Sequence, residues 1–248
     1  MNAAIKNRVL GEAYFNSAVM NYELATNYGD DRMGVPIVTV ENMDHTEAVP
    51  RAANITENYK HAINQFKKAA DLLPFFDTYA AADQGRAHKV AAWGYLSKTY
   101  LYMKDYANAE LYADSVINFG KRRLEDNYKD VFTTARNYGT EYIWSVTSSA
   151  AGPDGWGSIL PGVMLTNGGW GKYNGWGYYL PTKELYDAYE TGDIRREATI
   201  LKPGDKFMYF GVETTFAPPS AALSDYQFNK YMEPFSHANP IGLSLIHI

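Results

Sequence analysis

The chain contains no cysteine among its 248 residues. This absence excludes disulfide bonds, thiolate metal sites and a cysteine nucleophile. The sequence also lacks any apolar run close to the roughly 20 residues that a helix needs to span a bilayer. The length alone allows one large domain with a sizeable core.

The chain also lacks a strong excess of one charge and the residue spacings that are typical of metal sites. The formal net charge is -5, both signs are spread along the chain, and no basic stripe marks a nucleic-acid surface. The five histidines show no His-Glu-x-x-His spacing, and Asp30-Asp31 lacks the ligand spacing of an EF-hand. We therefore expect no nucleic acid, no metal and no cofactor.

The strongest pattern that is present is a helical hairpin at residues 91–120, AAWGYLSKTYLYMKDYANAELYADSVINFG, broken at Lys104-Asp105. Apolar residues recur at three- and four-residue spacing on both sides of the break, which predicts two amphipathic helices. They are Trp93, Leu96, Tyr100 and Met103 in the first helix, and Tyr106, Ala109, Ala113, Val116 and Ile117 in the second. Small alanine faces let the helices approach closely, as in a tetratricopeptide unit. Such units mostly build scaffolds, which speaks against a compact single-site enzyme.

Two longer helices precede this hairpin. Residues 3–28 place Tyr14, Ala18, Tyr22 and Ala25 on one face, with Gly29 just past the end. Residues 54–73 carry a stripe of Tyr59, Ile63, Phe66, Ala70 and Leu73, and Pro74 ends them. The pair predicts a second hairpin with a long insertion between its helices.

The second half of the chain is predicted to be less regular. Residues 142–146 read as a short strand-like run, and residues 182–190 as a short helix with Thr182 as its N-cap. Asp193 and Arg195 are expected to pair around the following turn, and residues 202–236 to be irregular and aromatic. The predicted fold class is mainly α: tetratricopeptide-like helical hairpins with a large irregular, loop-rich ligand-binding region.

Several short motifs recur in the order and at the distances of one known family. They are Tyr28-Gly29, Gly34-Val35-Pro36, Leu72-Leu73-Pro74, the 91–120 hairpin, Glu141-Tyr142-Ile143-Trp144, Pro181-Thr182 with Glu184-Leu185, and Asp193 with Arg195. Together they cover nearly the whole chain from about Gly11 to about Tyr231. In this arrangement the chain resembles the SusD/RagB family, the surface glycan-binding lipoproteins of Bacteroidetes.

The resemblance implies a cellular location and two partners. A SusD/RagB protein sits on the cell outer membrane, exposed at the surface, and delivers a glycan into a SusC-like TonB-dependent transporter. The membrane would be reached only through a lipid anchor on an N-terminal cysteine, which this sequence lacks. Some family members serve peptides, so the resemblance leaves the ligand class open between glycan and peptide.

The resemblance also bears on the domain organisation. We expect a single SusD-like domain over residues 1–248 that is truncated at both ends. Residues 3–150 would form the repeat-helix scaffold and residues 151–236 the aromatic-rich binding region. The last residues, 243–248 (LSLIHI), carry no helix pattern and are expected to be a non-native tail.

The aromatic residues concentrate in the glycine-rich segment 155–179. It holds Trp156, Trp170, Tyr173, Trp176, Tyr178 and Tyr179, with Asn167, Lys172 and Asn174 as polar neighbours. Flat aromatic faces cover the C–H face of a sugar ring, and the phenol or indole N–H can bond its hydroxyls. Glycine lets a ligand approach the backbone closely. The candidate ligand-binding residues are Trp170, Tyr173, Trp156 and Trp176.

Core packing is the competing interpretation for several aromatics. Trp176 and Tyr179 lie closest to Leu180-Pro181-Thr182, and packing under the helix that starts there is favoured for both. Trp93, Tyr100 and Tyr106 lie at repeat spacing and are expected to belong to the helical core. If the glycine-rich loop does not bind, Phe207, Tyr209, Phe210 and Phe216 are the next aromatics to consider.

No constellation points to catalysis. Glu184, Asp187 and Glu190 form an acidic helix face, and paired carboxylates can cleave glycosides. Carboxylates this close on a short helix are usually solvated surface groups. We therefore expect no enzyme but a protein that binds oligosaccharide or polysaccharide. The alternatives are a repeat-scaffold adaptor for protein partners and, less favoured, a glycoside hydrolase.

Overall fold

The computed structural model describes residues 2–39, 41, 46, 48–146, 160–165, 175–209, 211–219 and 222–232. The chain divides into two compact units, residues 1–123 and residues 124–247. Each unit is described by itself. None of the helices in the described ranges combines the length and the apolar character needed to cross a membrane.

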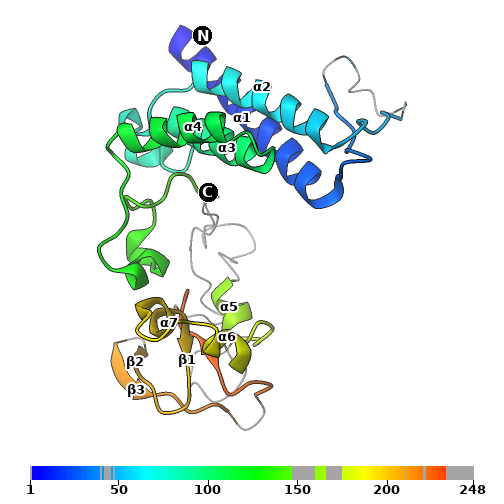
Figure 1. The fold of residues 1–248 in the computed structure, drawn as a ribbon. Helices are drawn as coiled ribbons and strands as arrows, with labels where there is room; N and C mark the ends of the chain where they lie inside the picture. The colour runs from blue at the N-terminus through cyan, green and yellow to red at the C-terminus, as the bar shows by residue number, and fades with distance from the viewer. Residues whose placement is uncertain are drawn as a thin grey trace. The chain divides into compact units, whose positions relative to one another are not determined.

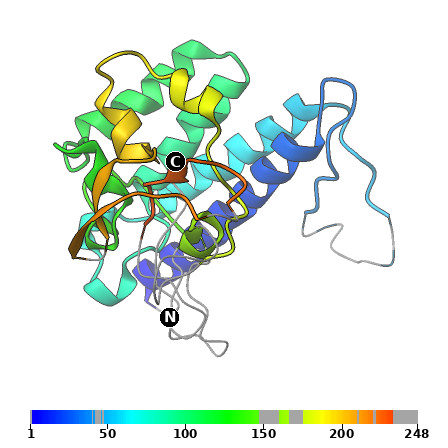
Figure 2. The ribbon, with the colours of Figure 1, turned by 90° about the horizontal axis from the view of Figure 1, so that it is seen from below.

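The first unit is helical. It contains α1 (Ala3–Tyr28), α2 (Ile55–Leu72), α3 (Lys89–Tyr102) and α4 (Tyr106–Asn118), with the 3-10 helices η2 (Phe76–Thr78) and η3 (Ala81–Asp83) between α2 and α3. Helices α1 and α2 lie side by side, and α3 packs against α2 and α4 (Figures 1 and 2). Both predicted hairpins are confirmed, and the fold class is mainly α as predicted.

Polar side chains fix where these helices begin. Asn54 accepts a hydrogen bond from the Glu57 amide at 3.2 Å, and Asp105 accepts one from the Asn108 amide at 3.2 Å. Such N-caps satisfy amide groups that have no partner inside the helix. Lys104 turns the chain between α3 and α4 with a φ of +60°. The break predicted at Lys104-Asp105 is therefore confirmed.

The core of this unit is an aromatic cluster between alanine-rich faces. Phe66 of α2 stacks on Tyr95 of α3, with ring centroids 5.0 Å apart and an interplanar angle of 11°. Phe15 of α1 meets both rings edge-on at 5.8 and 5.6 Å. The small residues of the three helices are fully buried around them: Ala18, Ala25, Ala62, Ala69, Ala91 and Ala92. All five residues of the stripe predicted for α2 are buried.

The prediction for α4 is correct only in part. Ala109 and Val116 are buried as expected, but Tyr106 is 64% exposed and Ile117 is 66% exposed. Periodicity identifies an apolar face, but it does not show whether a neighbouring element covers all of that face. Among the described residues, α3 is the helix that packs extensively on α4, and it covers only part of the stripe.

The insertion between α1 and α2 is anchored by one buried side chain. Asn58 is fully buried, its Nδ2 donates to the Val35 carbonyl oxygen at 2.9 Å, and its Oδ1 accepts from the Val35 amide at 3.0 Å. A Cβ on Gly34 would lie 2.1 Å from Asn58 Oδ1, so this position requires glycine. Arg51 closes the insertion by donating from Nε to the Gly34 carbonyl oxygen at 2.6 Å.

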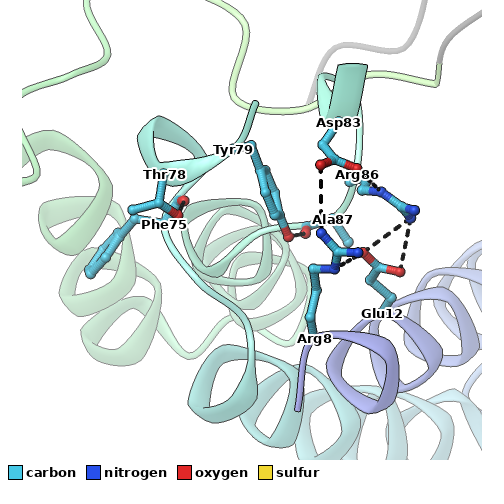
Figure 3. A network of polar contacts seen from close by, with 8 residues as sticks. All are labelled: Arg8, Glu12, Phe75, Thr78, Tyr79, Asp83, Arg86 and Ala87. Atoms are coloured by element: carbon cyan, nitrogen blue, oxygen red, sulfur yellow. Dashed lines mark hydrogen bonds and ion pairs between the residues drawn. The ribbon is translucent and has the colours of Figure 1, made fainter. Parts of the chain in front are cut away.

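A network of four alternating charges ties the segment after α2 to α1 (Figure 3). Arg86 donates from Nε to Asp83 Oδ1 at 2.7 Å and pairs with Glu12 at 3.2 Å. Arg8 pairs with Asp83 at 3.6 Å and with Glu12 at 3.8 Å. Beside them, the Tyr79 hydroxyl donates to the Ala87 carbonyl oxygen at 2.7 Å. Because each charge meets opposite charges, the network has a structural role.

The second unit is built from short elements. They are η4 (Tyr128–Phe132), η5 (Thr134–Arg136), α5 (Leu160–Met164), α6 (Lys183–Asp187), α7 (Ile194–Thr199), β1 (Ile200–Leu201), β2 (Lys206–Tyr209), β3 (Val212–Thr215) and β4 (Gln227–Phe228). Strands β1 and β4 pair antiparallel, as do β2 and β3, which pair Phe207 with Thr214. Leu201, Phe207 and Phe216 form the core beside these strands.

Two sequence predictions for this unit are wrong. Residues 142–146 form no strand; Tyr142 is instead buried and its hydroxyl donates to the Val131 carbonyl oxygen at 2.6 Å. The segment predicted to be irregular contains the β2–β3 hairpin and half of the β1–β4 pair. The predicted scaffold and binding-region boundaries stay predictions.

Candidate functional site

The candidate site lies where the glycine-rich aromatic segment leads into α6. Of the four residues predicted to bind ligand, Trp176 belongs to the described part of the chain. Trp156, Trp170 and Tyr173 lie outside the described residues, as do their predicted polar neighbours Asn167, Lys172 and Asn174. Those predictions stay open. The part of the site that the structure describes consists of residues 160–165 and 175–190.

The segment after the loop runs along α5 and is hydrogen-bonded to it. The Trp176 amide donates to the Gly162 carbonyl oxygen at 2.7 Å, and the Tyr179 amide donates to the Val163 carbonyl oxygen at 3.2 Å. A Cβ on Gly175 would lie 2.3 Å from the carbonyl oxygens of both Gly162 and Leu165. Only glycine allows the two backbones to approach this closely.

A buried amide holds α5 in place. Gln227 is fully buried, and its Nε2 donates to the Met164 carbonyl oxygen at 2.7 Å and to the Phe228 carbonyl oxygen at 3.0 Å. Leu165, at the end of α5, is also buried. The backbone that carries Trp176 therefore rests on an anchored support.

Trp176 and Tyr178 form an aromatic ledge on this support. Their rings are stacked, with centroids 5.9 Å apart and an interplanar angle of 11°. Trp176 is half-buried, whereas Tyr178 is 71% exposed. Gly177 between them has a φ of +64°, a left-handed conformation that favours glycine. Tyr178 was not among the residues predicted to bind ligand, and the glycine between two aromatics was the available signal for this pair.

Tyr179 contradicts the core-packing prediction. Its side chain is 60% exposed, so it does not pack under the start of α6. Trp176 is only half-buried, which leaves part of its surface accessible. The aromatics next to Pro181-Thr182 therefore face solvent more than their distance from the helix predicted.

The start of α6 is held in place by hydrogen bonds and by the packing of two aromatic rings. Thr182 Oγ1 accepts from the Leu185 amide at 3.2 Å, which confirms the predicted N-cap. Ser224 donates to the Pro181 carbonyl oxygen at 2.6 Å. The Tyr186 ring packs on Tyr226, with centroids 5.2 Å apart.

The carboxylates near α6 are engaged at the surface. Asp187 pairs with Lys183, and Asp193 pairs with Arg195 at 2.6 Å as predicted. A hydrogen bond from its backbone amide, and a smaller one from Thr182, lower the pKa of Glu184. Hydrogen bonds from Arg195 lower the pKa of Asp193. A general acid for glycoside cleavage needs a raised carboxyl pKa, so both shifts have the opposite direction.

The other aromatic candidates are distributed between core and surface. Tyr100 is 8% exposed and stacks on Tyr112 at 5.8 Å, so its core assignment is confirmed, whereas the assignment of Tyr106 is wrong. Trp93 is half-buried and meets Phe75 at 5.7 Å. The reserve candidates Phe207 and Phe216 are buried in the core of the second unit, Tyr209 packs against them, and Phe210 lies outside the described residues.

The described ranges contain no group of three or more His, Asp or Glu side chains that could hold a metal ion. Asp30 uses its Oδ1 to accept hydrogen bonds from the Arg32 and Met33 amides, both at 2.8 Å. These bonds lower the pKa of Asp30. They indicate that the Asp30-Asp31 pair belongs to a turn.

Comparisons with known proteins agree on one family. A SusD-like family model, described as "Starch-binding associating with outer membrane", matches residues 2–101. A SusD-like protein of Bacteroides ovatus is 24% identical over 230 residues, which cover 86% of this chain and 40% of that protein.

Solved structures show the same fold. A SusD-like protein from Bacteroides fragilis matches with a TM-score of 0.76 and 23% identity, covering 98% of this chain and 55% of that one. A laminarin-binding SusD-like protein matches with a TM-score of 0.70 and 23% identity, covering 94% and 53%. The chain spans 40% of the curated relative and roughly half of these solved chains.

Proposed function

We propose that the chain is a SusD/RagB protein, which the family model and the curated relative support, and that it binds oligosaccharide or polysaccharide without cleaving it. The observation that carries the proposal is the aromatic ledge of Trp176 and Tyr178. Two stacked, nearly parallel rings on a hydrogen-bonded backbone offer flat apolar faces, which suit the C–H face of a sugar. The laminarin-binding relative supports the ligand class.

The ledge is suited to binding because its geometry exists before the ligand arrives. The Trp176 amide is bonded to α5, and Gln227 anchors α5 in turn. A pre-ordered surface loses less conformational entropy when a ligand binds than a flexible loop does. Trp156, Trp170 and Tyr173, which lie outside the described residues, remain proposed ligand contacts in addition to the ledge.

The proposal does not include glycoside hydrolysis, because the carboxylates near the ledge lack the environment that a general acid needs. Glu184 is exposed, Asp193 is partly buried, and the hydrogen bonds of both carboxylates favour the ionised form. A carboxyl group that must donate a proton to a leaving oxygen needs the opposite environment. Release of new reducing ends from a polysaccharide, above a heat-inactivated control, would reject this part of the proposal.

Within the same proposal, the bound glycan is delivered to a SusC-like TonB-dependent transporter at the outer membrane surface. The support is the family match and the description of the family model as associating with the outer membrane. Co-purification with a SusC-like transporter would test the partner, and absence of any such complex would argue against it.

The test of glycan binding uses laminarin and starch, two of the glycans named in the descriptions of similar proteins. Affinity electrophoresis in gels containing each polysaccharide should show retardation of the 248-residue chain. Trp176→Ala and Tyr178→Ala should reduce the retardation. Tyr106→Ala removes an equally exposed tyrosine from α4 and should leave it unchanged.

A protein-binding adaptor remains the second candidate because α1 exposes large apolar side chains. Val9, Met20 and Leu24 are each at least half exposed on this helix. Apolar surface of this kind suits packing against another protein element. If no glycan in a broad panel retards the chain while Met20→Lys abolishes a protein complex, the adaptor function replaces the proposed one.

A further inference from the structure

The second unit contains a pocket of about 490 Å³ that is separate from the aromatic ledge. It lies among η4, α7, β1, the start of β2 and the residue after β4. Its lining residues are Asn127, Lys129, Ile194, Glu197, Ala198, Leu201, Asp205, Lys206, Phe207 and Asn229. Pockets of this volume hold small molecules, and six of the ten lining residues are polar or charged, which suits a polar ligand.

Several polar groups of the pocket already have partners. Asp205 accepts from the Lys202 amide at 3.0 Å and pairs with the Lys202 ammonium at 3.6 Å. Lys206 pairs with Glu213 at 3.6 Å. Asn127 accepts from the Lys129 amide at 3.1 Å and donates to Asp130. These groups shape the pocket, and their hydrogen-bonding capacity is largely used.

Lys129 is different. Its ammonium makes no hydrogen bond or ion pair of up to 4.0 Å with any described residue, although the side chain is half-buried. Burial lowers its pKa, and the negative charge of Asp130 offsets this only in part. Partial loss of water without a protein partner disfavours the charged form of an ammonium. An anion bound in the pocket would supply the partner that the Lys129 ammonium lacks among the described residues.

Asn229 offers a second free group at the same pocket. It is 8% exposed, its Nδ2 donates to the Glu197 carbonyl oxygen at 2.9 Å, and its amide donates to the Thr199 carbonyl oxygen at 2.8 Å. Within the described ranges its Oδ1 accepts no hydrogen bond. A carbonyl oxygen held this firmly is a fixed acceptor for a hydroxyl donor.

We propose that this pocket binds a small hydroxylated carboxylate, such as a uronic acid unit of an acidic glycan. The ligand carboxylate contacts the Lys129 ammonium, and a ligand hydroxyl donates to Asn229 Oδ1. A neutral sugar would satisfy Asn229 but would leave the Lys129 charge uncompensated. The Glu197 carboxylate is exposed and solvated, so it opposes an anion only weakly.

The test is a titration of the 248-residue chain with D-glucuronate, D-glucose and acetate, followed by NMR shifts of 13C-methylated lysines. D-glucuronate should bind saturably and raise the titration midpoint of Lys129, because a bound carboxylate favours the ammonium form. D-glucose and acetate should bind at least about tenfold more weakly, since each lacks one charge-assisted or hydroxyl contact. Equal binding of D-glucose or of acetate would overturn the proposal.

Variants separate a ligand contact from a structural role. Lys129→Met should weaken D-glucuronate binding at least about tenfold, the effect of one lost charge-assisted hydrogen bond, without lowering the melting temperature. Lys129→Arg keeps the charge and should retain binding. The control Lys183→Met removes an exposed lysine of α6 outside the pocket and should have no effect. Unchanged binding in Lys129→Met, or a Lys129 titration that D-glucuronate does not move, would refute the site.

The test of the pocket is independent of the test of glycan binding at the aromatic ledge. Trp176→Ala and Tyr178→Ala remove no residue of the pocket and should leave the affinity for D-glucuronate unchanged. If the ledge does not bind laminarin, the proposal for the pocket is therefore unaffected. If the pocket does not bind D-glucuronate, the proposal for the ledge is likewise unaffected.

Discussion

Removal of the Tyr178 ring should weaken glycan binding and leave the fold intact. Tyr178 is 71% exposed, so it keeps roughly 140 Å² of the about 200 Å² of an aromatic side chain accessible. A sugar ring that covers one face would remove about half of this area from water. At about 25 cal/mol per Å², the contact contributes about 1.8 kcal/mol. Tyr178→Ala should therefore weaken binding about twentyfold.

The assay is isothermal titration with a soluble laminarin oligosaccharide, with thermal unfolding measured on the same samples. Because Tyr178 is exposed, its removal should change the free energy of unfolding by at most about 0.5 kcal/mol. Tyr178→Phe keeps the stacking face and should bind nearly as the parent does. Trp176→Ala should lose binding and also about 1–2 kcal/mol of stability, because this larger side chain is partly buried against the protein.

Two results would refute the reasoning. Parent-like affinity in both Tyr178→Ala and Trp176→Ala would show that the ledge is not the platform, and the predicted contacts Trp156, Trp170 and Tyr173 would then be tested. A loss in Tyr178→Phe as large as in Tyr178→Ala would assign the effect to the hydroxyl rather than to stacking.

The remaining predictions concern stability. Tyr100→Ala should lower the free energy of unfolding by about 3–5 kcal/mol in urea titrations, because it removes a buried ring that stacks on Tyr112; an unchanged urea midpoint would contradict this. Gly34→Ala should lower it by about 1–3 kcal/mol, since the new Cβ would meet Asn58 Oδ1 at 2.1 Å; parent-like stability would contradict the close contact. Burial raises the pKa of Tyr79 from 10.0 to about 12, so the unfolded chain ionises first and stability falls between about pH 10 and about pH 12. Tyr79→Phe should show a shallower alkaline loss, and an identical pH profile would contradict the shift.

The long helices could be predicted from the sequence because their signals are local. The α2 stripe has a regular period, Asn54 caps its start, and Pro74 follows its end, so helix and buried face are both predicted correctly. The exposure of Tyr106 could not be predicted this way. It depends on which element covers α4, and that is a property of the tertiary structure.

The two wrong predictions for the second unit have different origins. Tyr142 lies in a β-prone run, but its burial and its hydrogen bond to Val131 serve an irregular chain rather than a strand. The β2–β3 hairpin had a usable signal, because Gly211, with a φ of +91°, stands between two runs that favour strands. The aromatic content of the segment predicted irregular structure and did not indicate the turn.

The position of the aromatic ledge follows from backbone contacts that the aromatics themselves do not reveal. Gly175 is enclosed by the carbonyl oxygens of Gly162 and Leu165, and this close approach lets the following amide bond to α5. Gln227, far away in sequence, then fixes α5 through the Met164 carbonyl oxygen. The glycines of this segment were first interpreted as room for a ligand. For Gly175 the structure supports a different role, in which glycine admits the protein's own backbone and so gives Trp176 and Tyr178 a firm base.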